Sequence, residues 1–272
     1  MTTHPRSSGF FPLIPLCTGF GILILAWVGV LLFDVLDVSG LGSWLYDRLH
    51  DRSPERAQVW VILFGEAGPI EMVQWLFLVA AAGLSFHIHG RLSAGGSKSR
   101  EDARARMFWL IMGIAFLLML IEDAGNPRHW FRHFFWEFLG DHQGRISEMI
   151  YFAALGALPL TALVFFSRPV LRMYKSRWLL LGGFFFYAIA VGGSVTRYYW
   201  YEAAGNFLHA TVLGETLKEV ALGDQGHGFW LMDYLVEESL ELVGATLLVA
   251  AAVAFLRDYP AFLPAPGRSA PP

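Results

Sequence analysis

Six long runs of apolar residues alternate with polar segments along the chain. They lie at Phe10–Phe33, Met72–Phe86, Met107–Ile121, Met149–Phe166, Trp178–Val195 and Leu242–Leu256. A helix needs roughly 20 residues to cross the hydrocarbon core of a bilayer. Polar residues at the ends of the shorter runs complete that length. The pattern predicts an all-α, polytopic integral membrane protein with about six transmembrane helices.

Two stretches need a separate interpretation. The first run is longer than the apolar part of a secretory signal peptide and has no small-residue cleavage site, so we expect an uncleaved first span. The apolar patch Val59–Phe64 is too short to cross a bilayer. It is typical of an interfacial or re-entrant helix on the outer side of the membrane.

The chain is expected to form one domain. Residues 1–9 form a short cytoplasmic leader, residues 10–258 a single six-helix transmembrane domain, and residues 259–272 a proline-rich, disordered cytoplasmic tail. A faint repeat runs through the domain, because each even-numbered span opens near a glutamate: Glu71, Glu148 and Glu238. Three two-helix repeats would bring these glutamates together around a shared polar centre.

The basic residues predict the orientation. With six spans both termini share one side, and that side holds 12 of the 20 Lys and Arg residues, mostly in the two short loops after the second and fourth runs. The positive-inside rule places these loops, and therefore both termini, in the cytoplasm. The outer side and the outer half of the membrane hold 20 of the 23 acids. We expect a bacterial inner membrane protein with its chemistry on the outer face.

Composition excludes several classes of protein. The chain is 55% hydrophobic and 16% charged, with a mean hydropathy of +0.47, which is too apolar for an ordinary soluble domain. Cys17 is the only cysteine, so no intramolecular disulfide, CxxC redox pair or thiolate metal site can form. The basic residues are scattered and form no platform for nucleic acid. The expected partners are therefore the lipid bilayer and either a lipidic substrate or a cation.

The segment Ile121–Glu148 carries the densest chemistry. Carboxylates at the end of a membrane span are costly unless they are paired, hydrated or bound to a cation. Within this segment His129, His133 and Glu137 recur at four-residue intervals, which places them on one face of a helix. Two imidazoles one turn apart can chelate a divalent metal. The alternative is an aromatic interfacial helix whose histidines lie among lipid headgroups.

A second row of polar residues opens the last span. Asp233, Glu237 and Glu241 recur at four-residue intervals, and Glu238 lies beside them. Like charges one turn apart repel one another, so in a low dielectric the row favours metal binding, proton transfer or cation passage. The alternative is a buried salt-bridge network with four arginines of the same side, Arg128, Arg132, Arg145 and Arg197.

The leading hypothesis from these patterns is a metal-dependent membrane enzyme acting on a lipidic or interfacial substrate. Its divalent metal would be bound by His129, His133 and His142 together with Glu122, Asp123 or Glu148. The general base would be one of Glu237, Glu238 and Glu241. The remaining members of the polar centre would be Glu71, Arg128 and Asp233.

Two other classes of function fit the same residues. A proton- or cation-coupled transporter or channel would use a carboxylate relay formed by Glu71, Glu148, Glu238 and Glu241. A non-catalytic membrane subunit would use its arginines and carboxylates as a purely structural network. The enzyme predicts a bound metal, the transporter predicts a polar path to the cytoplasm, and a tight arginine–carboxylate lattice with no open ligand position favours the structural subunit. The sequence argues against the polar path, because the cytoplasmic halves of the six spans are mostly apolar.

Overall fold

The computed structural model describes residues 13–49, 57–95, 99–213 and 225–259 of the chain. Of these residues 92% are helical and none lies in a strand. Six helical segments are long and apolar enough to cross a membrane: Leu13–Val35, Val59–Ala94, Arg100–Gly125, Ile146–Phe166, Tyr174–Thr211 and His227–Asp258. The predicted all-α architecture with six such helices is confirmed. The predicted leader, residues 1–9, and the predicted tail beyond residue 259 lie outside the described residues.

All the spanning helices except the first are longer than the apolar runs that predicted them. In chain order they are α1 (Leu13–Val30), α2 (Leu41–Leu49), α3 (Val59–Phe64), α4 (Pro69–Ala94), α5 (Arg100–Gly125), α6 (Pro127–Leu139), α7 (Asp141–Thr161), α8 (Arg168–Leu171), α9 (Tyr174–Leu208), α10 (His227–Trp230) and α11 (Glu238–Asp258). π-helical turns follow α1, α7 and α9 and precede α11. The helices outlast the apolar runs because polar residues at their ends keep helical geometry, as the first turn of α5 does.

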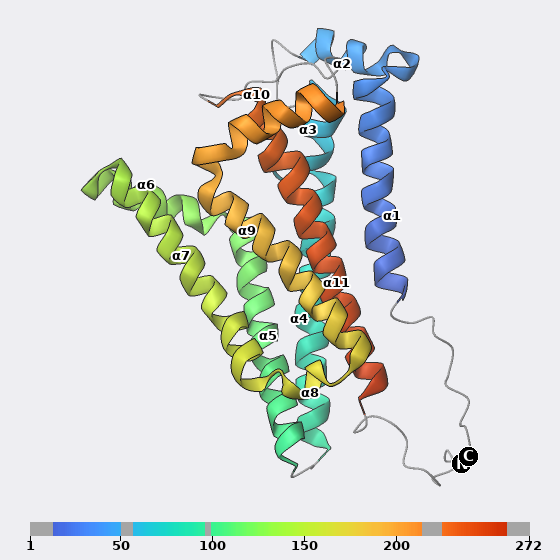
Figure 1. The fold of residues 1–272 in the computed structure, drawn as a ribbon, viewed down its shortest axis with the longest axis vertical. Helices are drawn as coiled ribbons and strands as arrows, with labels where there is room; N and C mark the ends of the chain where they lie inside the picture. The colour runs from blue at the N-terminus through green and yellow to red at the C-terminus, as the bar shows by residue number, and fades with distance from the viewer. Residues whose placement is uncertain (1–12, 50–56, 96–98, 214–224, 260–272) are drawn as a thin grey trace.

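Helix α11 lies at the centre of the bundle (Figure 1). It packs against α9 and α4, with α1 also in contact with it and α5 paired with α4. Small residues allow this close packing, since a Cβ atom added to Gly244 of α11 would lie only 2.6 Å from the Tyr187 ring of α9. Helices α6 and α7 pack against each other and stand further out (Figure 1).

The two ends of the bundle differ in charge. The end that carries α2, α6 and α10 is called the acidic end here, because Glu71, Asp123 and Glu237 lie there. The opposite end, which carries α8, is the basic end, and α1 begins and α11 ends there (Figure 1). At the basic end Arg172 pairs with Glu101 and links the end of α8 to the start of α5.

The half of the bundle nearer the basic end has an apolar core. Its largest fully buried side chains include Phe108, Trp109 and Phe255, each with an exposed fraction of 0%. The buried Ser85 and Ser176 donate their hydroxyl hydrogens to backbone carbonyls, at 2.7 Å and 3.1 Å, so these groups are already satisfied. The described residues therefore place the concentration of charge at one end of an apolar core.

The corner between α5 and α6 is set by Asn126 and Pro127. Asn126 has a φ of 46°, the left-handed conformation that asparagine tolerates better than most residues, and its N–H donates to the Glu122 carbonyl at 2.8 Å. Pro127 then starts α6, where its missing N–H costs nothing. Helix α5 therefore ends at Gly125, and Arg128 falls in the first turn of α6.

One face of the short helix α3 is buried, whereas Ile62 on the other face is exposed. Trp60 and Phe64 each have an exposed fraction of 0%. The carboxylate of Asp34, in the turn after α1, accepts hydrogen bonds from the N–H groups of Val59 and Trp60 at 2.9 Å and 2.7 Å and so caps the helix. Helix α3 leads through Gly65 into the long helix α4, and its re-entrant placement stays a prediction.

Candidate functional site

Three helices bring carboxylates together at the acidic end. A π-helical turn, Leu231–Glu237, precedes α11, and such turns are frequent at functional sites. The predicted row of acids lies on this turn and the first turn of α11. All four acids of the row border one small cavity of about 30 Å³. The seven carboxylates around this cavity are Glu66, Glu71, Asp123, Asp233, Glu237, Glu238 and Glu241, and Arg128 borders it as well.

Gln74 is the polar centre of this arrangement. Its exposed fraction is 0%, and its Nε2 donates to Asp123 Oδ2 at 2.8 Å and to Glu241 Oε2 at 2.6 Å. One amide group thus links α4, α5 and α11. Its carbonyl oxygen Oε1 is also buried and accepts no hydrogen bond.

Glu71 lies one turn before Gln74 on α4. Its carboxylate accepts a hydrogen bond from the backbone N–H of Ala67, which precedes the helix, and its exposed fraction is 6%. It borders the same cavity as Glu238. Two of the three glutamates of the proposed repeat therefore meet, whereas the third, Glu148, pairs with Arg197 instead.

A second cavity of about 50 Å³ adjoins the first and shares Asp123, Arg128 and Glu241 with it. Gln74 borders it too, and its other wall is apolar, with Leu155 of α7 among the lining residues. The ring of Tyr187 lines it on the side of α9. The two cavities make a short polar space that is bounded by carboxylates on one side and by hydrocarbon on the other.

Arg128 lies between the two cavities. Its Nη1 donates to Ser194 Oγ at 3.2 Å, its Nε lies 3.6 Å from Glu122 Oε1, and its guanidinium carbon lies 5.6 Å above the Phe152 ring. Burial and the nearby Arg197 guanidinium lower the pKa of Arg128, but the carboxylates of Glu237, Glu122 and Asp233 outweigh them, so its pKa is raised overall. Arg128 is therefore a permanent cation.

Arg197 forms tighter ion pairs than Arg128, and Arg132 also has a carboxylate partner. Arg197 lies 3.2 Å from Asp233 and 3.4 Å from Glu148, and its exposed fraction is 6%. Arg132 lies 3.8 Å from Glu148 and also donates to the Tyr198 hydroxyl. Three of the four arginines named for a salt-bridge network thus have carboxylate partners. The side chain of the fourth, Arg145, lies outside the described residues.

Sequence reasoning missed three members of the site. They are Glu66, which borders the first cavity, Gln74, and Tyr201, whose hydroxyl donates to Glu237 at 2.7 Å. The signal for Gln74 was present, since it is a lone amide three residues after Glu71 in an otherwise apolar run. Tyr201 lay within a string of aromatic residues typical of a membrane interface, and nothing in that pattern separates it from its neighbours.

The residues predicted to bind metal are spread over several places. His133 is exposed on α6, with its ring stacked on Trp136 at a centroid distance of 6.0 Å. Glu122 faces Arg128, Asp123 faces Gln74, and Glu148 faces Arg197. The side chains of His129 and His142 lie outside the described part of the chain, and within that part no group of three His, Cys, Asp or Glu side chains has the geometry to hold a metal ion.

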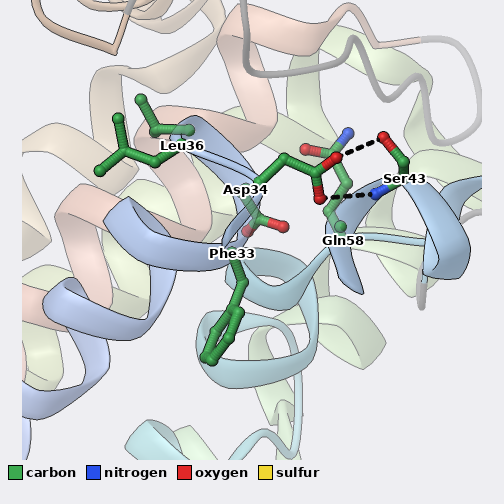
Figure 2. Close-up of a pocket in the computed structure, with 8 residues that line it drawn as sticks. Phe33, Asp34, Leu36, Ser43 and Gln58 are labelled. Atoms are coloured by element: carbon green, nitrogen blue, oxygen red, sulfur yellow. Dashed lines mark hydrogen bonds between the residues drawn. The ribbon is translucent and has the colours of Figure 1, made fainter. Parts of the chain in front are cut away.

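A larger cavity of about 260 Å³ lies at the acidic end of α1 and is lined by Phe33, Asp34 and Gln58 among others (Figure 2). Its carboxylates already have partners. Asp34 caps α3, and Asp37 accepts hydrogen bonds from the N–H and hydroxyl of Ser43 at 3.1 Å and 2.6 Å. Asp34 therefore acts as a helix cap, and Asp37 stabilises the turn before α2.

The chain matches no known family model, no curated protein and no solved structure. The geometry of the acidic end is therefore the basis for any statement about function.

Proposed function

We propose that this protein is a cation-coupled membrane transport protein whose acidic end binds protons or a small monovalent cation. The observation that carries this proposal is the excess of charge around one cavity, where seven carboxylates face a single arginine among the described lining residues. In a low-dielectric interior these carboxylates cannot all be ionised without compensation. Bound protons or cations supply the positive charge that balances them.

The donor set supports a small, hard cation. Carboxylate and carbonyl oxygens are the ligands that such ions prefer. The unpartnered Gln74 Oε1 lies in the second cavity, next to two carboxylates. A space of about 50 Å³ holds one or two water-sized particles. A dehydrated monovalent ion or a pair of waters therefore fits without rearrangement.

The charge distribution supports a direction for the site. The positive-inside rule places the basic end in the cytoplasm, so the acidic end faces outwards. The apolar core around Trp109 separates the cavities from the basic end. A coupled transporter is closed on one side in each of its states, and this arrangement corresponds to a state that is closed towards the cytoplasm.

Flux in liposomes tests this proposal. The purified protein is reconstituted into liposomes with an acidic lumen and a trapped pH-sensitive dye, and choline chloride outside is replaced in turn by sodium, potassium or lithium chloride. We expect at least one of the three salts to alkalinise the lumen, because the cation entering the site exchanges with protons. Glu241→Gln should slow this flux about tenfold or more, because it removes an exchangeable charge.

Glu101→Gln is the matched control. It makes the same chemical change at an exposed carboxylate of the basic end, and its flux should stay within about twofold of the wild type. The proposal is wrong if no salt gives a flux above that of choline. It is equally wrong if Glu241→Gln transports at the wild-type rate.

A metal-dependent enzyme on a lipidic substrate is the second candidate. The observation in its favour is the mixed lining of the second cavity, where Glu122 and Asp123 face the apolar Phe152 and Leu155. Such a lining suits an amphiphile that enters from the bilayer. Elemental analysis of protein purified without chelators, alongside the His129→Ala/His133→Ala variant, tests it. A stoichiometric metal that is lost in the variant favours the enzyme, and its absence from the wild type excludes this metal site.

A structural network is the third candidate, favoured by the buried Arg197 with carboxylates of both α7 and the last span as partners. Breaking a buried ion pair leaves an uncompensated charge and costs about 3–5 kcal/mol. A protein with neither bound metal nor cation flux, whose Arg197→Met variant unfolds at a much lower temperature, would fit this reading.

A further inference from the structure

Arg128 reaches the acidic cavities from a helix that is not one of the six apolar spans. It lies in the first turn of α6, directly after the corner at Asn126. At its other end α6 stops at Gly140, whose φ of 97° is again left-handed. Residues at such φ values at both ends separate α6 sharply from the helices before and after it. The charge of Arg128 therefore belongs to a small separate element.

Arg128 has few close contacts, although many carboxylates surround it. One hydrogen bond joins it to Ser194, and Glu122 pairs with it at 3.6 Å. The buried Nε atoms of Arg128 and Arg197 both lack a hydrogen-bond acceptor, so the two residues differ in their carboxylate partners. Arg197, in contrast, has carboxylate oxygens of Glu148 and Asp233 at 3.4 Å and 3.2 Å. A guanidinium whose one carboxylate partner, Glu122, lies at 3.6 Å is easier to displace than a guanidinium with two carboxylate partners at shorter distances.

The space beside Arg128 also contains an unused ligand. Gln74 is fully buried, and its Oε1 has no hydrogen-bond partner. Both side chains border the second cavity, together with Asp123 and Glu241. A buried carbonyl oxygen without a donor is costly unless something else occupies its side of the cavity. A cation there would satisfy it and would lie next to the guanidinium, where the two positive charges repel each other.

We propose that Arg128 is a built-in counter-ion of the acidic site, which neutralises the cavity when it is empty and is displaced by the incoming monovalent cation. This inference rests on the proposed cation binding. It makes Arg128 a competitor that sets the affinity of the site. It also links occupancy of the site to the position of α6, because Arg128 and α6 move together.

The liposome flux assay measures this competition through the cation concentration that gives half-maximal flux. The salt is whichever of sodium, potassium and lithium chloride drives the wild-type flux. Arg128→Gln should lower the half-maximal concentration about tenfold, because the competing charge is gone. Arg132→Gln is the control: Arg132 lies one turn further along α6 and pairs with Glu148. It should stay within about twofold of the wild type, because Glu148 keeps Arg197 as a partner at 3.4 Å.

The outcomes separate the two proposals. A wild type without cation-dependent flux overturns the proposed function and the displacement of Arg128 with it. A normal wild-type flux with an unchanged or higher half-maximal concentration in Arg128→Gln overturns the displacement alone. A guanidinium with a purely structural role gives this second result, because its loss weakens the site instead of freeing it.

Hydrogen–deuterium exchange of the wild type decides the question if Arg128→Gln does not fold. Exchange is compared in saturating driving salt and in choline chloride at the same concentration. Displacement of Arg128 should speed exchange in the peptide that covers Pro127–Leu139 relative to the peptide that covers α5. Identical exchange of both peptides in the two salts would overturn the displacement.

Discussion

At the scale of single residues, Gln74 is the side chain on which the acidic end depends. Its amide donates to a carboxylate on α5 and to another on α11, at 2.8 Å and 2.6 Å. Hydrogen bonds to charged acceptors contribute about 1.5–3 kcal/mol each, more than bonds between neutral groups. An amide also carries no charge of its own, so it holds two carboxylates together without neutralising them. That leaves their charge available to a proton or a cation.

Gln74→Leu should destabilise the protein although it conserves volume. Asp123 and Glu241 would lose a donor in a buried place, at a cost of about 1–3 kcal/mol for an unsatisfied polar group. Thermal unfolding in mild detergent would show the loss as a midpoint several degrees lower. Met72→Leu, at an exposed position of the same helix, is the control and should unfold with the wild type. Equal midpoints for Gln74→Leu and the control would show that these bonds do not stabilise the fold.

At the scale of elements, the corner between α5 and α6 determines where Arg128 lies. The left-handed Asn126 ends α5, and Pro127 starts α6 in a new direction. A residue with a Cβ and no compensating side chain pays about 1–2 kcal/mol for that conformation. The position of the guanidinium therefore depends on two uncharged residues, Asn126 and Pro127, of which Asn126 also borders the first cavity.

Asn126→Ala and Asn126→Gly form a matched pair that tests this corner. Glycine adopts positive φ without strain, so Asn126→Gly should unfold at the wild-type temperature and keep its cation affinity. Asn126→Ala should be destabilised by about 1 kcal/mol and should shift the half-maximal cation concentration, because Arg128 moves with the corner. If both variants behave like the wild type, the corner does not position Arg128.

The sequence predicted the elements better than the contacts between them. Apolar runs mark helices that are long enough to span a membrane, and all six were confirmed. The apolar runs after the first were shorter than the helices, because polar residues at their ends, such as Glu71 before the second run, also have helical geometry. The clustering of acids on the last span was predicted from spacing, whereas the role of Gln74 was not, since one amide makes no periodic pattern. Arg197 pairs with carboxylates on two other helical segments, so no pattern in the sequence around Arg197 predicts its partners.

At the scale of the whole molecule, charge is divided between two ends that an apolar core separates. The short basic loops predict that the end with α8 is cytoplasmic and that the acidic cavities open to the outside. With this orientation, cations reach the proposed site from outside, and the cytoplasmic side must open in the next step of transport. It is a property of the entire chain, because no single loop determines it.

Cysteine labelling tests the orientation. In a Cys17→Ser background, Phe138→Cys on the exposed face of α6 should react with a membrane-impermeant maleimide in intact cells. Lys175→Cys, at the start of α9 at the basic end, should react only after the membrane is permeabilised. The reverse pattern would place the acidic end in the cytoplasm and would contradict the proposed access from outside.

The most direct measurement of the central claim is infrared difference spectroscopy of the purified protein in a lipid film. Choline chloride is exchanged in turn for sodium, potassium and lithium chloride. If the carboxylates around the first cavity hold exchangeable protons, at least one salt should remove carboxylic-acid C=O absorption and add carboxylate absorption. The change should be smaller in an Asp123→Asn/Glu241→Gln variant. No change with any of the three salts would contradict the account, because the acidic end would then bind no exchangeable cation.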